Sequence, residues 1–113
     1  MVAVSGAAPL VPAVAEAFRK AVGVEIVEGW GLTETSPVAT VNPPGAVRFG
    51  TVGTTIEGVR VRIIDDAEGE LPPGSEGEVC VKGENVMKGY WNRPDETRAT
   101  FTADGWLKTG DIG

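Results

Sequence analysis

The chain has 113 residues, which is enough for one domain with a real core. Its net charge of -6 at pH 7 and its pI near 4.6 argue against nucleic acid and anionic membrane surfaces as partners. The lack of histidine excludes a Ser–His–Asp triad and a His-ligated metal site, and the single Cys80 excludes an internal disulfide and a multi-cysteine zinc site.

The same composition bears on localisation. No stretch is long and apolar enough to span a bilayer, and the N-terminus lacks the basic-then-apolar order of a signal peptide. One unpaired cysteine suits a reducing compartment. We therefore expect a cytoplasmic protein with no transmembrane segment.

Residues 1–27 show the pattern strand, helix, strand. Residues 1–4 and 24–27 are short apolar runs that predict strands. Between them, Pro12 suits the first turn of a helix and Gly23 suits its C-terminal cap. Apolar residues at helical spacing predict one apolar helix face, made of Val11, Val14, Phe18 and Val22.

A strand–helix–strand unit of this kind almost always forms a right-handed crossover between parallel strands. The loops that follow the two strands, residues 5–8 and 29–33, then leave the same edge of one sheet. Ligands in open α/β sheets bind at that edge. We therefore predict that these two loops face one pocket.

Residues 29–35 concentrate useful side chains directly after the second strand. Two glycines allow a sharp turn or a close approach to a ligand, and Trp30 offers a broad aromatic face. Thr33 and Thr35 offer hydroxyls, and Glu34 offers a carboxylate able to hold a hard cation such as Mg²⁺. A ligand-binding loop accounts for this set. A buried tryptophan, a solvated glutamate and a capping threonine account for it as well.

The second half of the chain is predicted to be mainly strands. Residues 42–45, Asn-Pro-Pro-Gly, are a strong break. Alternating apolar residues predict strands near 59–64, 77–83 and 106–109. Residues 94–100 begin with a proline and two acids, which suits a short helix.

Three features of this half concern candidate sites. Cys80 is interpreted as structural, since free cysteines usually behave as small apolar residues. The clustered apolar bulk of residues 85–91 is interpreted as packing. Asp111 follows a glycine at a strand end, where a carboxylate can accept two hydrogen bonds from a diol such as ribose. The alternative is a turn aspartate that bonds its own backbone.

Four short motifs occur in order over nearly the full chain. They are Ser-Gly-Ala-Ala-Pro-Leu at 5–10, Gly-Trp-Gly-Leu-Thr-Glu-Thr at 29–35, Gly-Glu-Val-Cys-Val-Lys-Gly at 77–83 with Met-Lys-Gly-Tyr-Trp at 87–91, and Trp-Leu-Lys-Thr-Gly-Asp at 106–111. Together they resemble the adenylate-forming superfamily of acyl-CoA synthetases, luciferases and peptide-synthetase adenylation domains. The later motifs most resemble bacterial medium- and long-chain fatty acyl-CoA ligases.

The resemblance implies a nucleotide site with Mg²⁺. In the family, the small-residue loop packs its backbone on the adenine, and an aromatic residue, commonly Tyr and here Trp30, stacks on the other face. Thr33 would bond the α-phosphate and Glu34 would hold Mg²⁺, so these two are the expected catalytic residues. Asp111 would bind the ribose hydroxyls, and Gly31 would lie beside the acyl chain. The expected nucleotide-binding residues are Gly6, Ala7, Ala8, Trp30, Gly31, Thr33 and Asp111.

The resemblance also implies a fold of class α/β plus β. Residues 1–42 would be the C-terminal part of an α/β nucleotide-binding subdomain, a β-α-β piece of a parallel sheet layer. Residues 43–113 would form a small, distorted β-barrel subdomain ending at the ribose-binding motif. The family's phosphate-binding loop would lie upstream and its catalytic lysine downstream. We therefore expect a fragment that is inactive alone and that self-associates through unpaired strands.

The implied chemistry is the ATP-dependent activation of a fatty acid as an acyl-adenylate, followed by its transfer to CoA. The expected partners are therefore fatty acid, ATP and CoA. Two alternatives stay open. One is an amino-acid adenylation domain of a peptide synthetase, which the sequence of residues 85–91 fits less well. The other is a β-rich binding module that has lost catalysis.

Overall fold

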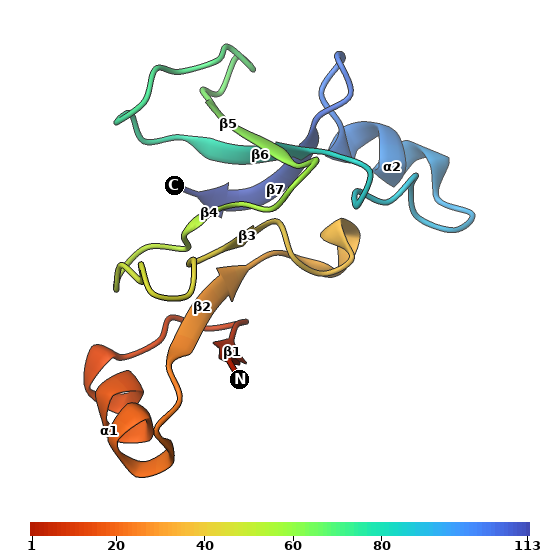
Figure 1. Cartoon of the computed structure of the whole chain (residues 1–113). Helices are drawn as coiled ribbons and strands as arrows, with labels where there is room; N and C mark the ends of the chain where they lie inside the picture. The colour runs from red at the N-terminus through yellow and green to blue at the C-terminus, as the bar shows by residue number, and fades with distance from the viewer.

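The computed structural model describes residues 1–113 and contains two sheets and two α-helices (Figure 1). A four-stranded sheet has the order β1-β2-β3-β4, and a three-stranded sheet has the order β5-β6-β7. The predicted α/β class is therefore confirmed. Neither helix is long and apolar enough to cross a membrane. The elements are β1 (Ala3–Ser5), α1 (Pro12–Val22), β2 (Ile26–Trp30), the 3-10 turn η1 (Thr33–Thr35), β3 (Thr40–Val41), β4 (Thr54–Thr55), β5 (Arg60–Ile64), β6 (Glu78–Lys82), α2 (Pro94–Thr100) and β7 (Leu107–Ile112).

β1 and β2 run parallel and are joined by α1, as the sequence pattern predicts. The pairing begins with Ala3 opposite Ile26. Pro12 is the first residue of α1, and Gly23 ends the helix in the left-handed conformation that glycine adopts without strain. The loops after β1 and β2 consequently leave the same edge of the sheet.

The apolar face of α1 is more exposed than its pattern suggests. Ala15 is the only buried residue of the helix, and Val11, Val14 and Val22 are each more than half exposed. β1 has three residues and β2 has five, so the paired strands beneath α1 are too short to cover the whole face. This end of the molecule is thinly packed.

Two further short strands extend the first sheet. β3 pairs antiparallel with β2, and β4 pairs antiparallel with β3. Asn42 closes the loop between them, since its side chain donates to the carbonyl of Thr51 at 2.7 Å and accepts from the N–H of Arg48 at 2.9 Å. The chain changes sheet between β4 and β5. The division into subdomains 1–42 and 43–113 stays a prediction.

The second sheet is antiparallel and encloses the larger apolar side chains. Val61 lies opposite Val81, and Val81 lies opposite Leu107; the last two are almost fully buried. Cys80 is buried as well, and burial raises the pKa of its thiol to about 11, in agreement with a structural role. β5 and β7 are the edges of an open sheet of three strands. The predicted barrel is therefore not confirmed.

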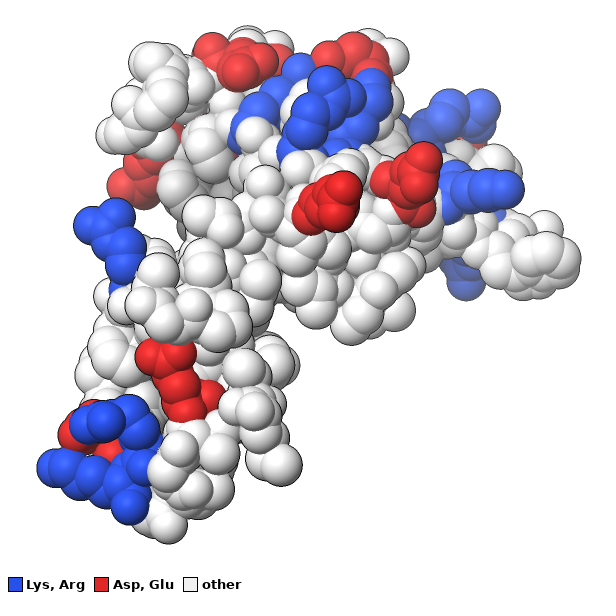
Figure 2. All heavy atoms as spheres, viewed as in Figure 1, with Lys and Arg blue, Asp and Glu red and all other residues white.

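A largely covered arginine stabilises the outer face of this sheet. The Arg62 guanidinium lies 4.5 Å from the centre of the Trp106 ring and donates to both carboxylate oxygens of Asp104, at 2.7 and 2.8 Å. These bonds, together with the Thr102 hydroxyl, hold the pKa of Asp104 well below its usual range. Figure 2 shows basic and acidic side chains mixed over this part of the molecule, at the top of the view.

The two sheets meet at a small shared core and through one amide. The core contains Ala39, Val59 and Val81, with Trp30, Ile56, Val61 and Val86 packed around them. The Asn85 side chain donates to the carbonyls of Thr35 and Val38, at 2.8 and 2.9 Å. These contacts hold the loop after β2 against the second sheet.

Candidate functional site

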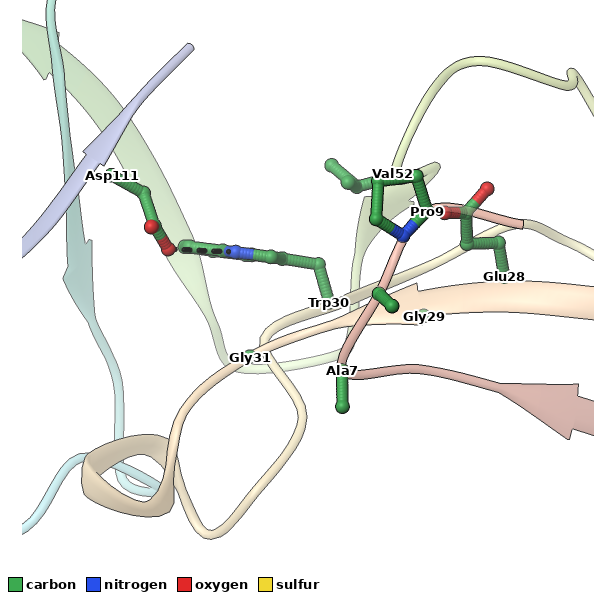
Figure 3. Close-up of a pocket in the computed structure, with 9 residues that line it drawn as sticks. Ala7, Pro9, Glu28, Gly29, Trp30, Gly31, Val52 and Asp111 are labelled. Carbon is green, nitrogen blue, oxygen red and sulfur yellow. Dashed lines mark hydrogen bonds between the residues drawn. The ribbon is translucent and has the colours of Figure 1, made fainter. Parts of the chain in front are cut away.

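The loops after β1 and β2 meet a residue of β7 around one pocket (Figure 3). The prediction that these two loops face one pocket is therefore confirmed. The pocket has a volume of about 240 Å³. Its lining residues are Ala7, Ala8, Pro9, Glu28, Gly29, Trp30, Gly31, Val52 and Asp111.

Gly31 allows the sharp turn at the end of β2. A Cβ at this position would overlap the carbonyl oxygen of Pro37 and would lie 2.9 Å from the backbone nitrogen of Ala39. These are backbone atoms of the same loop, so they cannot move aside cheaply. The N–H of Ala39 donates to the carbonyl of Trp30 at 2.9 Å, which holds the returning chain close to β2.

The turn that follows Gly31 is built around Thr35. This residue is fully buried, and its hydroxyl accepts the N–H of Leu32 at 2.9 Å and lies 3.1 Å from the carbonyl oxygen of Pro37. Thr35 therefore caps the turn, as the alternative interpretation of residues 29–35 predicts for a threonine of this loop. Thr33, by contrast, is exposed at the start of η1 and is free for another role.

Trp30 and Asp111 are joined across the two sheets. The indole Nε1–H donates to Asp111 Oδ2 at 3.0 Å, although the residues are 81 positions apart. Figure 3 shows the indole reaching from β2 to this carboxylate. Asp111 lies within β7 and its carboxylate does not bond its own backbone, so the alternative of a turn aspartate is wrong. Its second oxygen, Oδ1, has no hydrogen-bond partner in the chain.

Glu28 is a pocket residue that is absent from the predicted site residues. It is buried, and its Oε1 accepts the N–H of Leu10 at 3.0 Å, which fixes the loop after β1 onto β2. An acid directly before Gly29, at the predicted sheet edge, was the available signal. Val52 also lines the pocket, and no pattern marks it in the sequence.

Three of the predicted site residues lie outside the pocket lining: Gly6, Thr33 and Glu34. A Cβ on Gly6 would lie 3.3 Å from the carbonyl oxygen of Gly29, so Gly6 packs against the second loop. Glu34 lies in η1, where its Oε1 accepts the Tyr90 hydroxyl at 2.8 Å, and this bond raises the pKa of Tyr90. The structure thus brings the adenine and ribose candidates together, with the phosphate and metal candidates on the adjoining turn.

The acidic side chains near the site fit a shared metal ion rather than a closed metal centre. No group of three or more His, Cys, Asp or Glu residues in the chain could hold a metal by itself. Mg²⁺ usually keeps several waters and is bound by one or two carboxylates together with substrate phosphates. Glu34 fits such a partial site, because only its Oε1 is engaged in a hydrogen bond.

Comparison with known sequences points to one family. A family model described as AMP-binding enzyme matches residues 1–91. A long-chain-fatty-acid–CoA ligase of Escherichia coli O6:H1 is 44% identical over 108 residues, which cover 95% of this chain and 19% of that protein. The 4-coumarate–CoA ligase 1 of Petroselinum crispum is 39% identical over 116 residues, which cover 96% of this chain and 21% of that protein.

Solved structures agree with the sequence comparisons. Apo MatB from Rhodopseudomonas palustris matches with a TM-score of 0.91 and 39% identity, over 99% of this chain and 22% of that chain. The ATP-bound form of the same protein matches with a TM-score of 0.88 and the same identity and coverage. The chain therefore spans about a fifth of the length of the relatives that it matches.

Proposed function

Because the chain belongs to the family of AMP-binding enzymes, we propose that it forms the adenosine-binding part of an ATP-dependent acyl-CoA ligase. The observation that carries this proposal is the pocket in which Trp30, Ala7, Ala8 and Asp111 meet. An aromatic face, small residues that allow close approach and a carboxylate are what a purine and a ribose diol require. The ATP-bound structure of MatB, a similar protein, supports the same assignment.

The size of the pocket limits what it holds. Pockets for whole small-molecule ligands usually measure about 300–1,000 Å³. The 240 Å³ between the two loops is smaller, so it suits the adenine and ribose and leaves the phosphates outside. We assign the adenine to the space between Trp30 and the backbone of Ala7 and Ala8, with Gly6 packed against the loop after β2 outside that space.

Asp111 would bind the ribose. Its Oδ2 already accepts the Trp30 N–H, which fixes the carboxylate at the pocket wall, and its Oδ1 is unpaired. A fixed carboxylate with one unpaired oxygen can accept a hydrogen bond from a ribose hydroxyl without first being ordered. The same bond to Trp30 couples the base-stacking residue to the sugar-binding residue.

Thr33 and Glu34 would act on the phosphates. Both lie on η1, directly after the pocket, with Thr33 exposed and Oε2 of Glu34 unpaired. We assign the α-phosphate to the hydroxyl of Thr33 and a Mg²⁺ ligand to the carboxylate of Glu34. Mg²⁺, when bound there, would neutralise charge on the phosphates of ATP.

The reaction would have two steps. The carboxylate of the acid attacks the α-phosphate of ATP and forms an acyl-adenylate and pyrophosphate. The thiol of CoA then attacks the acyl carbon and releases AMP. The residues of this chain would hold and orient the nucleotide rather than act as a nucleophile, which is consistent with a chain that contains no histidine.

We further propose that the acid is a fatty acid and that the enzyme works in the cytoplasm. The long-chain-fatty-acid–CoA ligase relative at 44% identity supports a fatty acid as the substrate, although the coumarate ligase carries a different acid in its name. Gly31, at the junction of pocket and turn, is where the acyl chain would pass. The single buried free cysteine is consistent with a location in the reducing cytoplasm.

A binding experiment on the labelled chain tests the proposal. Titration with a non-hydrolysable fatty acyl-adenylate should shift the amide resonances of the loops after β1 and β2 and those around Asp111. Trp30→Ala should abolish these shifts, and Trp91→Ala, at an exposed position outside the pocket, should leave them unchanged. No shifts, or shifts confined to the second sheet, would support the binding-module alternative instead. Analogues with short and long acyl chains then separate fatty acids from other acids.

A further inference from the structure

A tyrosine in the loop between β6 and α2 reaches the proposed metal ligand. The Tyr90 hydroxyl donates to Oε1 of Glu34 at 2.8 Å across 56 positions of sequence. The apolar bulk of residues 85–91 predicts packing, but Tyr90 is 39% exposed and Trp91 is 96% exposed. That interpretation is wrong for these two aromatic residues, so Tyr90 needs another explanation.

Tyr90 is itself held firmly from the side of α2. Its N–H donates to the Thr97 hydroxyl at 2.9 Å, and its carbonyl accepts the N–H of Arg93 at 3.3 Å. Gly89 permits this approach, since a Cβ there would lie 2.6 Å from the Thr97 methyl group. The Tyr90 side chain therefore extends from a backbone that these hydrogen bonds fix.

The backbone around Glu34 is fixed by other bonds. The N–H of Met87 donates to the Glu34 carbonyl at 2.8 Å, and the Asn85 amide holds the carbonyls of Thr35 and Val38. The turn thus keeps its shape without the tyrosine hydroxyl. The only part of Glu34 that these bonds leave unrestrained is its side chain, and that is the part Tyr90 contacts.

We propose that Tyr90 is a positioning residue for the Glu34 carboxylate: its hydroxyl occupies Oε1 and leaves Oε2 available to a cation. This inference rests on the proposed function, which makes Glu34 a ligand of Mg²⁺. A glutamate side chain at a partly exposed turn samples several rotamers, and ordering it costs free energy when the ligand binds. A hydrogen bond made beforehand removes part of that cost.

The first experiment needs no ligand. Tyr90→Phe keeps the ring and removes only the hydroxyl. In a chain with carbon-labelled glutamate carboxyl groups, we expect the Glu34 resonance to move and the Glu28 resonance to stay, because Glu28 is held by Leu10 instead. Amide shifts of the turn should change little. Trp91→Phe, a conservative change at the neighbouring aromatic residue, should move neither carboxyl resonance.

The second experiment measures the metal-dependent part of nucleotide affinity. The ratio of ATP affinity with Mg²⁺ to ATP affinity without it should fall about tenfold in Tyr90→Phe, the scale of one lost hydrogen bond to a charged group. AMP affinity without metal should stay within about twofold of wild type, because the adenosine pocket does not include Tyr90. Adding Tyr90→Phe to Glu34→Gln should produce no further loss.

The outcomes separate the two proposals. An unmoved Glu34 resonance, or equal losses for AMP and Mg²⁺-ATP, would overturn the positioning role of Tyr90. A wild-type chain that binds neither nucleotide would overturn the proposed function, and the carboxyl resonance would still decide whether Tyr90 orders Glu34. If Tyr90→Phe does not fold, Thr97→Val removes the acceptor of the Tyr90 N–H and should move the Glu34 resonance in the same direction.

Discussion

The two sheets of this molecule are stabilised in different ways. Among residues 3–55, four of the seven buried residues are polar, and the side chain of each one makes a hydrogen bond. Among residues 59–112, five of the six buried residues are apolar. The buried part of the first region is therefore held largely by side-chain hydrogen bonds, and that of the second by hydrophobic burial.

The two regions therefore differ in role: the first presents most of the candidate site, and the second supplies most of the stability. Loops closed by internal hydrogen bonds can present small residues and carboxylates at the surface, while burial elsewhere supplies stability. The separation is not complete, since Asp111 and Tyr90 of the second region reach Trp30 and Glu34 of the first. The candidate site forms only when both regions are folded and in contact.

The largest effect should come from the scaffold. Leu107→Ala removes a side chain that is almost fully buried in β7 and should lower the free energy of unfolding by about 2–5 kcal/mol. Ile112→Ala in the same strand removes an exposed side chain and should change it by about 0.5 kcal/mol or less. Urea denaturation measures both. Equal losses would show that the second sheet is not the stabilising region.

The next effect should appear in binding rather than in stability. Asp111→Ala should weaken the affinity for AMP by about 1.5–3 kcal/mol, because a charged hydrogen-bond acceptor for ribose is lost. Fatty-acid affinity should change far less. AMP lacking both ribose hydroxyls serves as the control, and it should lose less affinity in the variant than AMP does, because only the bond between Asp111 and Trp30 affects its binding. An equal loss for every ligand would indicate a structural role for Asp111.

A glycine substitution tests the hydrogen-bonded loops. Gly31→Ala should cost about 1–3 kcal/mol of stability, since its Cβ meets the carbonyl of Pro37, and it should broaden the amide signals of the loop after β2. The matched change is Gly58→Ala, whose Cβ meets nothing within 4 Å but whose φ of +78° still costs about 1 kcal/mol. An intact loop in Gly31→Ala would contradict the account of this turn.

The thin packing of the first region predicts self-association of the isolated chain. β1 is the edge strand of its sheet, and Val2 and Val4 on it or beside it are exposed. Sedimentation at micromolar concentration should show species larger than a monomer, and Val4→Lys should reduce them. A compact monomer at every concentration would contradict the prediction of self-association.

The smallest effect should be an acid-dependent loss of stability in the second region. The pKa of Asp104 is lowered by its bonds to Arg62 and Thr102, so its stabilising contribution is present above the ordinary carboxyl pKa and is lost as the pH falls through the lowered value. Asp104→Asn should flatten this part of the stability profile.

Local sequence patterns predicted the elements whose causes are local. Pro12 and Gly23 mark the ends of α1 because each restricts or frees the backbone at its own position. The parallel pairing of β1 and β2 followed from the chirality of the crossover. From these two facts the sequence predicted that the two loops share a pocket, which is most of the candidate site.

Features that depend on distant partners could not be predicted in the same way. β7 runs on through Asp111 to Ile112, which pairs with Glu78, whereas the local glycine suggested a strand end. Trp91 looked like core, but no other element covers it. The Tyr90–Glu34 bond joins segments whose distance depends on how the second sheet packs, and no periodicity reports that distance.

One pocket, built from both regions, is proposed to hold the adenosine part of the nucleotide. Intermolecular nuclear Overhauser effects between AMP and the labelled chain test this proposal. We expect contacts from the adenine protons to the Trp30 ring and the methyl groups of Ala7 and Ala8, with the ribose protons close to Asp111. Contacts to other residues, with none to Trp30, would contradict it.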